Sequence, residues 1–475
     1  MLETLNNWII SANDWIWTYL LIILLILIGL YFTFKSRFVQ FRYFGEMFRL
    51  LGQGVSNGKG KNSVSSFQAL MVSTASRVGT GNIIGISTAL CLGGFGSVFW
   101  MWAIAIIGGA TAFIESTLAQ VYKRRDANGD SYGGPAYYIE NALHNKLLAG
   151  AFAFFLIITY AGGFNALASY NLQSTFSVYG FYVKGVTSWI IGAVLAVLVG
   201  YCLMGGGKRI LRITEVLVPF MGVLYVLLSL VIIVMHIGMI PSVLSAVFAD
   251  AFDFQKILGG ISGSCMMYGI KRGLYSNEAG VGSAPNAAAA ADVSHPAQQG
   301  LVQMLSVFID TVLCTATALM CMFSGVTPTK AMAGAPYVQA ATQTDFGAFG
   351  PIMITVAMVL FAFTTLIGNL FYVDNCLAYL NGKKTPSAGF MKIFRLVAVL
   401  VIFVGAGMSM DNAWAVADIC MAFMCLINIP SILALNGTAI AVMDDYGRQL
   451  DAGVENPVFK ASDIGLDDSN LDYWK

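Results

Sequence analysis

Residues 74–87 read TASRVGTGNIIGIS and place three glycines, an arginine, an asparagine and several hydroxyls inside an otherwise apolar stretch. A continuous helix bonds its backbone groups internally, whereas an interrupted helix frees N–H and C=O groups for a ligand. Freed N–H groups at a helix N-terminus bind a carboxylate, and freed carbonyl oxygens suit a hard cation such as Na+. The stretch therefore predicts an interrupted helix, with Gly79, Gly81 and Gly85 permitting the unwound backbone.

A second stretch of the same kind covers residues 259–285 and reads GGISGSCMMYGIKRGLYSNEAGVGSAP. Glycines are also common where membrane helices pack closely, and the spacing of Gly81 and Gly85 fits that alternative. Two such stretches at corresponding positions favour interruption over packing alone.

The composition indicates a membrane protein. Of the 475 residues, 57% are hydrophobic and 11% are charged, whereas soluble proteins carry about 25% charged residues. A large soluble helical protein is excluded because the apolar runs lack polar faces. We therefore predict an all-α polytopic membrane protein. Eleven spans are predicted, at about 15–35, 65–91, 97–121, 148–174, 187–204, 213–238, 257–276, 300–325, 348–380, 394–410 and 412–441.

The basic residues alternate between the loops that join these spans. If the N-terminus lies outside, nearly all of the 26 Lys and Arg residues fall in inner loops, and Lys184, Lys256 and Lys330 fall in outer ones. Because Lys and Arg accumulate in cytoplasmic loops, this pattern predicts an N-out, C-in topology.

The two interrupted spans divide the chain into predicted units. Residues 1–64 hold an extra N-terminal helix and a basic cytoplasmic loop, and residues 65–238 and 239–441 each hold five helices. Since five is odd, the second set enters the membrane from the opposite side. Such inverted repeats with interrupted helices are typical of secondary transporters that bind at the midplane. The polar, acidic residues 442–475 are expected to form a weakly ordered cytoplasmic tail.

Polar side chains at membrane depth are further candidates. Asn165, Ser169 and Gln173 follow one another at four-residue spacing and so share a helix face. Asp310 lies near mid-depth, where an acid is functional or paired. Arg77 is the available partner, so one interpretation is a structural ion pair or a hydrogen bond between helices. The alternative is that Asp310 carries a proton.

Thr364 and Thr365 are adjacent in the span 348–380, and two interpretations stay open for them. Threonines of membrane helices often donate to carbonyl groups of their own helix. Their hydroxyl oxygens also suit Na+.

Several long motifs make the chain similar to the alanine/glycine:cation symporters, the sodium:alanine symporter family. They are STASRVGTGNIIGISTAL, GSVFWMWAIAIIGG, GGPAYYI, RGLYSNEAGVGSAPNAAAAA, HPAQQGLVQMLSVFIDTVLCTATAL, FAFTTLIG and WAVADICMAF, and they extend over nearly the whole length. The resemblance implies a LeuT-like 5+5 inverted-repeat fold, a place in the cell membrane, and Na+-driven uptake of a small neutral amino acid.

The resemblance also implies site residues. The carbonyls of Ala75 and Val78 and the hydroxyls of Thr364 and Thr365 would hold Na+. The carboxylate cradle would comprise Gly79, Thr80, Gly81 and Asn82, with Asn165 near the amino group and Met266, Met267 and Gly269 at the side-chain end of the second break. Ser276–Gly280 is expected to end a helix and act as a gate, outside the pocket.

Alanine or glycine is the expected substrate, and three other functions stay open. Ala168 replaces a larger polar residue common in the family, which favours glutamine or another larger neutral amino acid. Proton coupling through Asp310 and a non-transporting amino-acid sensor are the others. An enzyme is not expected, because no nucleophile–base pair or metal motif lies at depth. Nucleic acid is not an expected partner, and the sequence leaves the oligomeric state open.

Overall fold

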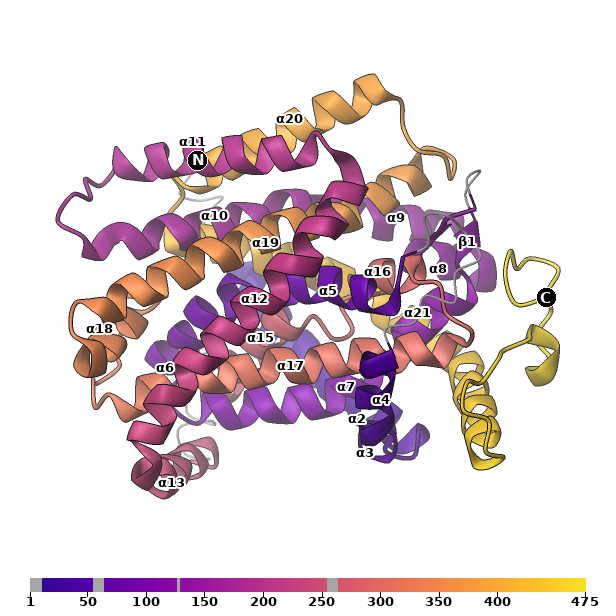
Figure 1. The fold of residues 1–475 in the computed structure, drawn as a ribbon, viewed down its shortest axis with the longest axis horizontal. Helices are drawn as coiled ribbons and strands as arrows, with labels where there is room; N and C mark the ends of the chain where they lie inside the picture. Colours follow the sequence, from indigo (N-terminus) through magenta and orange to yellow (C-terminus); the bar gives the residue numbers. More distant parts are fainter. Residues whose placement is uncertain (1–10, 54–63, 126–128, 254–263) are drawn as a thin grey trace.

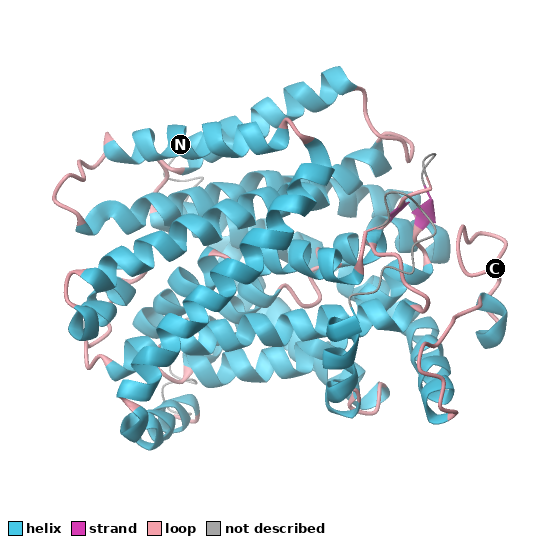
Figure 2. Cartoon of the chain, in the orientation of Figure 1, coloured by secondary structure: helices cyan, strands magenta, loops and turns pink. Residues whose placement is uncertain are grey.

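The computed structural model describes residues 11–53, 64–125, 129–253 and 264–475, and helices dominate this part of the chain (Figure 1; Figure 2). Two short strands, β1 (Arg124–Arg125) and β2 (Ser131–Tyr132), pair antiparallel with Arg124 opposite Tyr132. The helical segments are η1 (Ile16–Leu21), α2 (Ile22–Lys35), α3 (Val39–Arg42), α4 (Phe44–Gln53), α5 (Ser66–Arg77), η2 (Gly81–Gly85), α6 (Ile86–Gly93), α7 (Ser97–Val121), α8 (Pro135–Leu143), α9 (Lys146–Ile157), η3 (Ile158–Gly163), α10 (Phe164–Ser174), η4 (Thr175–Val178), α11 (Thr187–Leu203), α12 (Gly206–Met235), η5 (Ile237–Met239), α13 (Ile240–Ala251), α15 (Cys265–Asn277), α16 (Pro285–Ala290), α17 (Pro296–Phe323), η7 (Lys330–Met332), α18 (Ala335–Phe346), α19 (Phe349–Leu380), α20 (Ala388–Gly405), α21 (Met410–Asp451) and η8 (Ala461–Ile464).

Among the described residues, eight helical stretches are long and apolar enough to cross a membrane. Shorter apolar helices cover Gly81–Gly93, Thr187–Leu203 and Ile237–Ala251. Large apolar side chains on the outer helices stay exposed, with Val197 of α11 at 71% and Leu396 of α20 at 69%. Apolar surface of this kind suits a lipid environment. The eight stretches are Ser11–Lys35, Ser97–Val121, Lys146–Val178, Lys208–Met235, Pro296–Phe323, Phe349–Leu380, Ala388–Gly405 and Met410–Asp451.

The first predicted interruption is confirmed. A capping box at Ser65 starts α5, and the helix ends at Arg77, where Val78 leaves helical geometry with a ψ of 87°. In a continuous helix the Gly79 N–H would donate to the Ala75 carbonyl. It donates instead to Asn82 Oδ1 at 2.8 Å. The chain then resumes as η2 and α6.

The second interruption exists, but its predicted place at Met266, Met267 and Gly269 is wrong. These residues lie inside the continuous helix α15, which starts where the Ser264 hydroxyl accepts the Met267 N–H. Gly269 is small because α15 packs closely on α7: a Cβ there would lie 2.4 Å from the Ser97 carbonyl oxygen. Residues 254–263, which hold the start of the predicted stretch, lie outside the described residues.

The helix breaks instead between α15 and α16. Glu278 adopts a left-handed conformation with a φ of 54°, and Gly280 and Gly282 follow with φ values of 85° and 88°. Left-handed backbone is easy for glycine and strained for other residues, so the two glycines permit this turn. A helix end is expected within Ser276–Gly280, and α15 does end there, at Asn277, so the unwound part of the second interruption starts at Glu278.

The two interruptions face each other inside the bundle. A Cβ on Gly81 would lie 2.9 Å from the Tyr275 ring of α15, and the Ser76 hydroxyl donates to Glu278 at 3.0 Å. Around them, α5 packs against α12 and α19, and α15 and α17 pack against α7. Helices α11 and α20 lie side by side along one edge of the bundle (Figure 1).

The predicted weak order of the tail is wrong. Helix α21 continues ten residues beyond the predicted end of its span at 441, and the segment after it folds back onto the protein. Phe459, Ala461 and Leu471 are buried, because they pack against the hydrophobic core despite the acidic composition around them.

Candidate functional site

Helix α19 supplies the closest side chain to the first interruption. A Cβ on Gly79 would lie 2.1 Å from Thr365 Oγ1, and one on Gly368 would lie 3.1 Å from Ala75 Cβ. The glycines at 79 and 368 therefore let α19 approach the broken backbone, where a larger residue would clash.

The two threonines of α19 differ in their surroundings. Thr364 donates to the carbonyls of Leu360 and Phe361 in its own helix and lies 3.3 Å from Met221 Sδ. Thr365 is 4% exposed, and its hydroxyl has no hydrogen-bond partner within the described part of the chain. A buried polar atom without a partner calls for an explanation, and an ion bound beside the broken backbone is one that fits this position. The structure thus brings Thr365 to the break and turns the Thr364 hydroxyl into its own helix.

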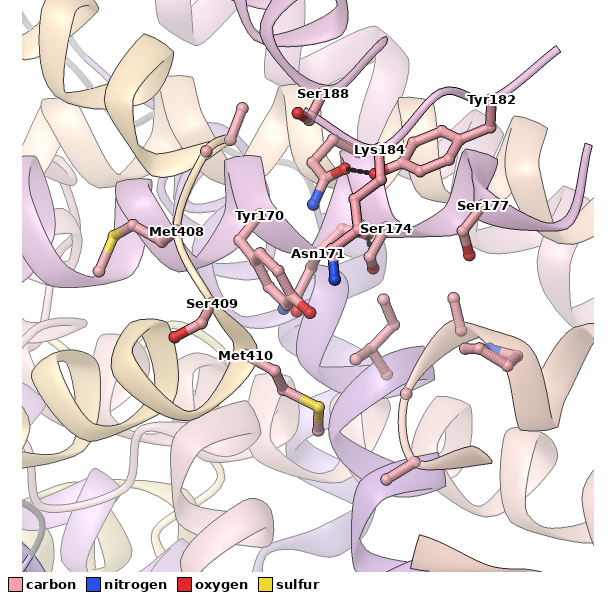
Figure 3. Close-up of a pocket in the computed structure, with 18 of the residues that line it drawn as sticks. Tyr170, Asn171, Ser174, Ser177, Tyr182, Lys184, Ser188, Met408, Ser409 and Met410 are labelled. Atoms are coloured by element: carbon pink, nitrogen blue, oxygen red, sulfur yellow. Dashed lines mark hydrogen bonds between the residues drawn. The ribbon is translucent and has the colours of Figure 1, made fainter. Parts of the chain in front are cut away.

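A cavity of about 580 Å³ reaches this region from one end of the bundle (Figure 3). Ile84, Asn171 and Trp414 line it near the first break, and Tyr182 and Lys184 lie further along it. Figure 3 shows Tyr170 and Asn171 of α10 opposite Met410 at the start of α21. The cavity therefore joins three elements that are distant in sequence.

Asn171 connects the cavity to the first break. Its side chain is buried and donates to Thr80 Oγ1 at 3.0 Å, whereas its Oδ1 atom has no partner among the described residues. The indole N–H of Trp414 is also buried and unpaired there. Two buried polar atoms of opposite character, an acceptor and a donor, thus lie in residues of the cavity wall without a partner among the described residues.

Aromatic rings close the site beneath the cavity. Tyr275 packs against Phe164 and Trp414, with ring centroids 4.8 and 4.9 Å apart. The Arg272 guanidinium lies 3.8 Å above the Trp414 ring and 3.1 Å from the Asp418 carboxylate. These contacts fix α15 against α21.

Asn165 lies in a polar network behind the first break and does not line the cavity. Its Oδ1 accepts from Asn369 at 2.8 Å, and Asn369 accepts from the Ser76 hydroxyl at 2.7 Å. The Ser76 hydroxyl also reaches Glu278, which accepts from Ser283 at 2.7 Å. The network therefore joins α10 and α19 to both interruptions.

Asp310 is not paired with Arg77. Its carboxylate accepts from Asn82 at 2.6 Å and from Ser276 at 2.9 Å, whereas Arg77 donates to the Gln303 carbonyl at 3.0 Å. Within the described residues, no Arg77 atom lies in an ion pair. The predicted ion pair with Arg77 is wrong, whereas the hydrogen bonds between helices that were its alternative are confirmed, because neutral donors from both broken helices satisfy the carboxylate. Asn82 itself bridges the Gly79 N–H and Asp310, and so stabilises the break.

Three residues of this region are absent from the predicted set: Asn171, Tyr275 and Trp414. Asn171 lies on a different face of its helix from the predicted stripe, whose Ser169 donates to the Ile402 carbonyl. Tyr275 lies inside the predicted stretch 259–285 but beyond the predicted pocket residue Gly269, so its place beside the first break follows only from the true location of the interruption. A buried Trp carries a polar N–H that usually needs a partner, which is the signal Trp414 offers in the sequence.

The match to known proteins decides the family. A model of the sodium:alanine symporter family matches residues 2–461. The chain belongs to this family. The predicted resemblance is confirmed, and the chain is a multi-pass protein of the plasma membrane and a Na+-coupled amino-acid symporter.

Several relatives are similar to this symporter over almost their full length. The amino-acid carrier protein AlsT of Bacillus subtilis is 40% identical, with 99% of this chain and 98% of the relative covered. The probable sodium/glutamine symporter GlnT of Bacillus subtilis is 38% identical, covering 100% and 97%. The sodium/alanine symporter AgcS of Methanococcus maripaludis is 37% identical, covering 91% and 95%.

The fold of this symporter is similar to a solved transporter structure. The crystal structure of MhsT in complex with L-phenylalanine matches with a TM-score of 0.53 at 16% identity, and covers 87% of this chain and 94% of that one. At this identity the match supports a shared membrane-transporter fold.

Proposed function

We propose that this symporter imports alanine or glycine with Na+ by alternating access around the two interrupted helices. The observation that carries the proposal is the first break itself, beside which lies the buried, unpaired Thr365 hydroxyl, and which is joined through the Asn171–Thr80 hydrogen bond to the wall of a cavity. The proposal also includes eleven spans, an N-out, C-in topology, and two five-helix repeats at 65–238 and 239–441. The first proposed repeat begins with its interrupted helix, α5 to α6, and in the second the interrupted helix, α15 to α16, follows the short helix α13.

Na+ would be held between α5 and α19. The Ala75 carbonyl has lost its regular partner, because the Gly79 N–H donates to Asn82, and Thr365 Oγ1 is buried and unpaired beside Gly79. Val78 lies in the unwound segment between them. We leave Thr364 out of the proposed ion site, because its hydroxyl donates to the carbonyls of Leu360 and Phe361 in its own helix. A hard cation prefers such carbonyl and hydroxyl oxygens.

The amino acid would lie over the restart of the helix at Thr80 and Gly81. The first N–H groups of a helix lack partners and suit a carboxylate. Asn171 and Trp414 would bound the substrate from the cavity, and the Tyr275 ring would lie beneath it. Because Met266, Met267 and Gly269 lie in an unbroken helix, we leave them out of the proposed pocket.

Glutamine is the second candidate substrate. The small side chain of Ala168, which the sequence suggests would enlarge the pocket, does not support it, because Ala168 does not line the cavity. A carboxamide carries one donor group and one acceptor, and these would match the open Asn171 Oδ1 and the open Trp414 N–H. The 38% identical relative named as a probable sodium/glutamine symporter also favours this substrate.

Proton coupling is the competing choice of driving ion. Asp310 is buried beneath the first break and bonded to Asn82 and Ser276, so a change in its protonation would reach both broken helices. We favour Na+ because Thr365 has an open oxygen, whereas the oxygen of Asp310 nearest the break already accepts two hydrogen bonds.

Uptake into proteoliposomes tests the proposed function. Labelled alanine, glycine and glutamine are offered separately under an imposed Na+ gradient, with K+ in place of Na+ as control. We expect alanine or glycine uptake that needs Na+ and grows with an inside-negative potential, which adds about 2.3 kcal/mol per charge per 100 mV. Uptake that persists without Na+ and collapses with a protonophore would reject Na+ coupling. Binding without flux would indicate a sensor.

A further inference from the structure

The segment after α21 folds back onto the end of the bundle opposite the cavity (Figure 1). Val458 exchanges two hydrogen bonds with the Gln449 amide, at 2.8 and 2.9 Å. Pro457 accepts from the Ser294 hydroxyl at 2.8 Å, and the Phe459 N–H donates to the Ser294 carbonyl at 3.0 Å. The beginning of this segment is therefore tied to the chain just before α17.

The last residues are tied to the end of α7. The Trp474 indole N–H donates to the Gln120 carbonyl at 2.9 Å. The Asp472 carboxylate accepts from the Arg124 side chain at 2.8 Å and from the Arg125 N–H at 3.1 Å. Three hydrogen bonds thus join Asp472 and Trp474 to the short stretch 120–125.

Trp474 also reaches the first interrupted helix. Its ring packs against the buried cluster of Ala69, Ala291 and Val293. Ala69 belongs to α5, whereas Ala291 and Val293 connect α16 to α17. One side chain of the tail therefore bonds to α7 and packs against a cluster shared by the N-terminal part of α5 and the chain that follows α16.

These contacts lie at the end of the bundle that must open during the proposed alternating access. Helices α5 and α16 are the halves of the two interrupted helices at the closed end of the bundle. If transport proceeds by the alternating access proposed above, this end must open while the cavity closes. Opening it separates α5 and α16 from α7, and Trp474 bridges all three regions.

We infer that residues 457–474 form an autoinhibitory latch, which holds this end closed and detaches when the protein opens there. The inference rests on the proposed alternating access. The latch is suited to release because its regular structure is the short turn η8, so detaching it breaks no long helix. Its Arg124–Asp472 ion pair is partly exposed, and such pairs bind weakly.

Cross-linking of the full-length protein tests the latch directly. A protein carrying both Arg124→Cys and Asp472→Cys is treated in proteoliposomes with a short, cleavable bifunctional thiol reagent. We expect loss of Na+-driven alanine uptake on joining and its recovery on cleavage. Each single variant, treated with the same reagent, is the control and keeps its uptake. A joined protein that transports at the unjoined rate would overturn the latch.

A releasing variant should act in the opposite direction. Trp474→Ala removes the bridge, so we expect a higher maximal uptake rate and a weaker apparent Na+ affinity measured from the cavity side. Asp467→Asn is the matched control, because Asp467 bonds to Ser469 within the tail. Unchanged rate and Na+ affinity in Trp474→Ala at wild-type thermal stability would contradict the latch, and the cross-link decides if this variant does not fold. Failure of the proposed function differs, since the unmodified protein would then show no Na+-dependent uptake.

Discussion

At the residue scale, substitutions of two adjacent threonines distinguish a role in ion binding from a role in helix structure. Thr365→Ala removes the unpaired hydroxyl beside Gly79, whereas Thr364→Ala removes one that bonds to its own helix. We expect Thr365→Ala to raise the Na+ concentration for half-maximal uptake about tenfold, equivalent to ~1.4 kcal/mol. Thr364→Ala is the matched control and should change it by less than about twofold. Equal effects of the two variants in Na+-titrated uptake would place the ion elsewhere.

Asn171 provides a second residue-scale prediction, on the substrate. Removing its amide in Asn171→Ala deletes the bond to Thr80 and the open oxygen in the cavity. Because such a bond contributes about 1.5 kcal/mol, we expect the KM for alanine to rise roughly tenfold. Ser177→Ala, further along the cavity, is the control and should leave KM unchanged. An unchanged alanine KM in Asn171→Ala, measured by concentration-dependent uptake, would remove Asn171 from the site.

At the element scale, the close approach of α19 to the first break predicts a specific glycine requirement. A Cβ on Gly79 would lie 2.1 Å from Thr365 Oγ1, whereas one on Gly222 of α12 would meet open space. Overpacking costs typically about 1–3 kcal/mol, and here it also displaces the hydroxyl. Gly79→Ala should therefore abolish Na+-driven uptake, and Gly222→Ala should not. Normal uptake by Gly79→Ala would show that this contact has no part in transport.

The attachment of the tail should depend on pH through Lys123, just beyond the end of α7. Burial lowers the pKa of Lys123 to about 7, although nearby Asp292 opposes this and Arg125 adds to it. Tyr473 and Trp474 of the tail cover the Lys123 ammonium, so we expect release of the tail to expose it and to raise its pKa towards the ordinary value of about 10.4. The released state then holds more protons between these values, so attachment strengthens as pH rises above about 7 and is weakest below it.

Hydrogen exchange of residues 459–474 at pH 6 and pH 8, corrected for intrinsic rates, measures this dependence. We expect lower protection at pH 6, and we expect Lys123→Met to lose the difference because it keeps the length without the charge. Greater protection at pH 6 in the unsubstituted protein would contradict the prediction.

The sequence predicts these elements well where apolar length and glycine spacing determine them. The spans at 97–121, 187–204 and 348–380 match α7, α11 and α19 within one residue, and the break after Arg77 is confirmed. The second break is misplaced because Gly269 serves close packing: a Cβ at this position would clash with the Ser97 carbonyl of the neighbouring helix α7. The local sequence does not reveal that contact. The docked tail is missed for the same reason, since its buried Phe459 and Leu471 find partners far away in the chain.

At the scale of the whole molecule, the site depends on contacts between distant segments. The resemblance implies that Ala75, Val78, Thr364 and Thr365 belong together. The structure brings Thr365 to the first break, whereas the Thr364 hydroxyl bonds to its own helix. The sequence does not predict that Asn165 bonds to Asn369 and not to a ligand. Both side chains are buried, and their residue types alone do not show which face of each helix lines the cavity. Tertiary packing therefore decides which of several polar side chains reach the cavity.

The most direct test of the central claim is whether Na+ and the amino acid support each other's binding at the first break. Calorimetry on the purified protein gives the alanine affinity with Na+ or with K+, and the Na+ affinity with and without alanine. Because coupling between two sites is reciprocal, we predict the same gain in both titrations, of about tenfold or more. Thr365→Ala should lose this gain and Thr364→Ala should keep it. Alanine that binds equally tightly in K+ and in Na+ would contradict the account.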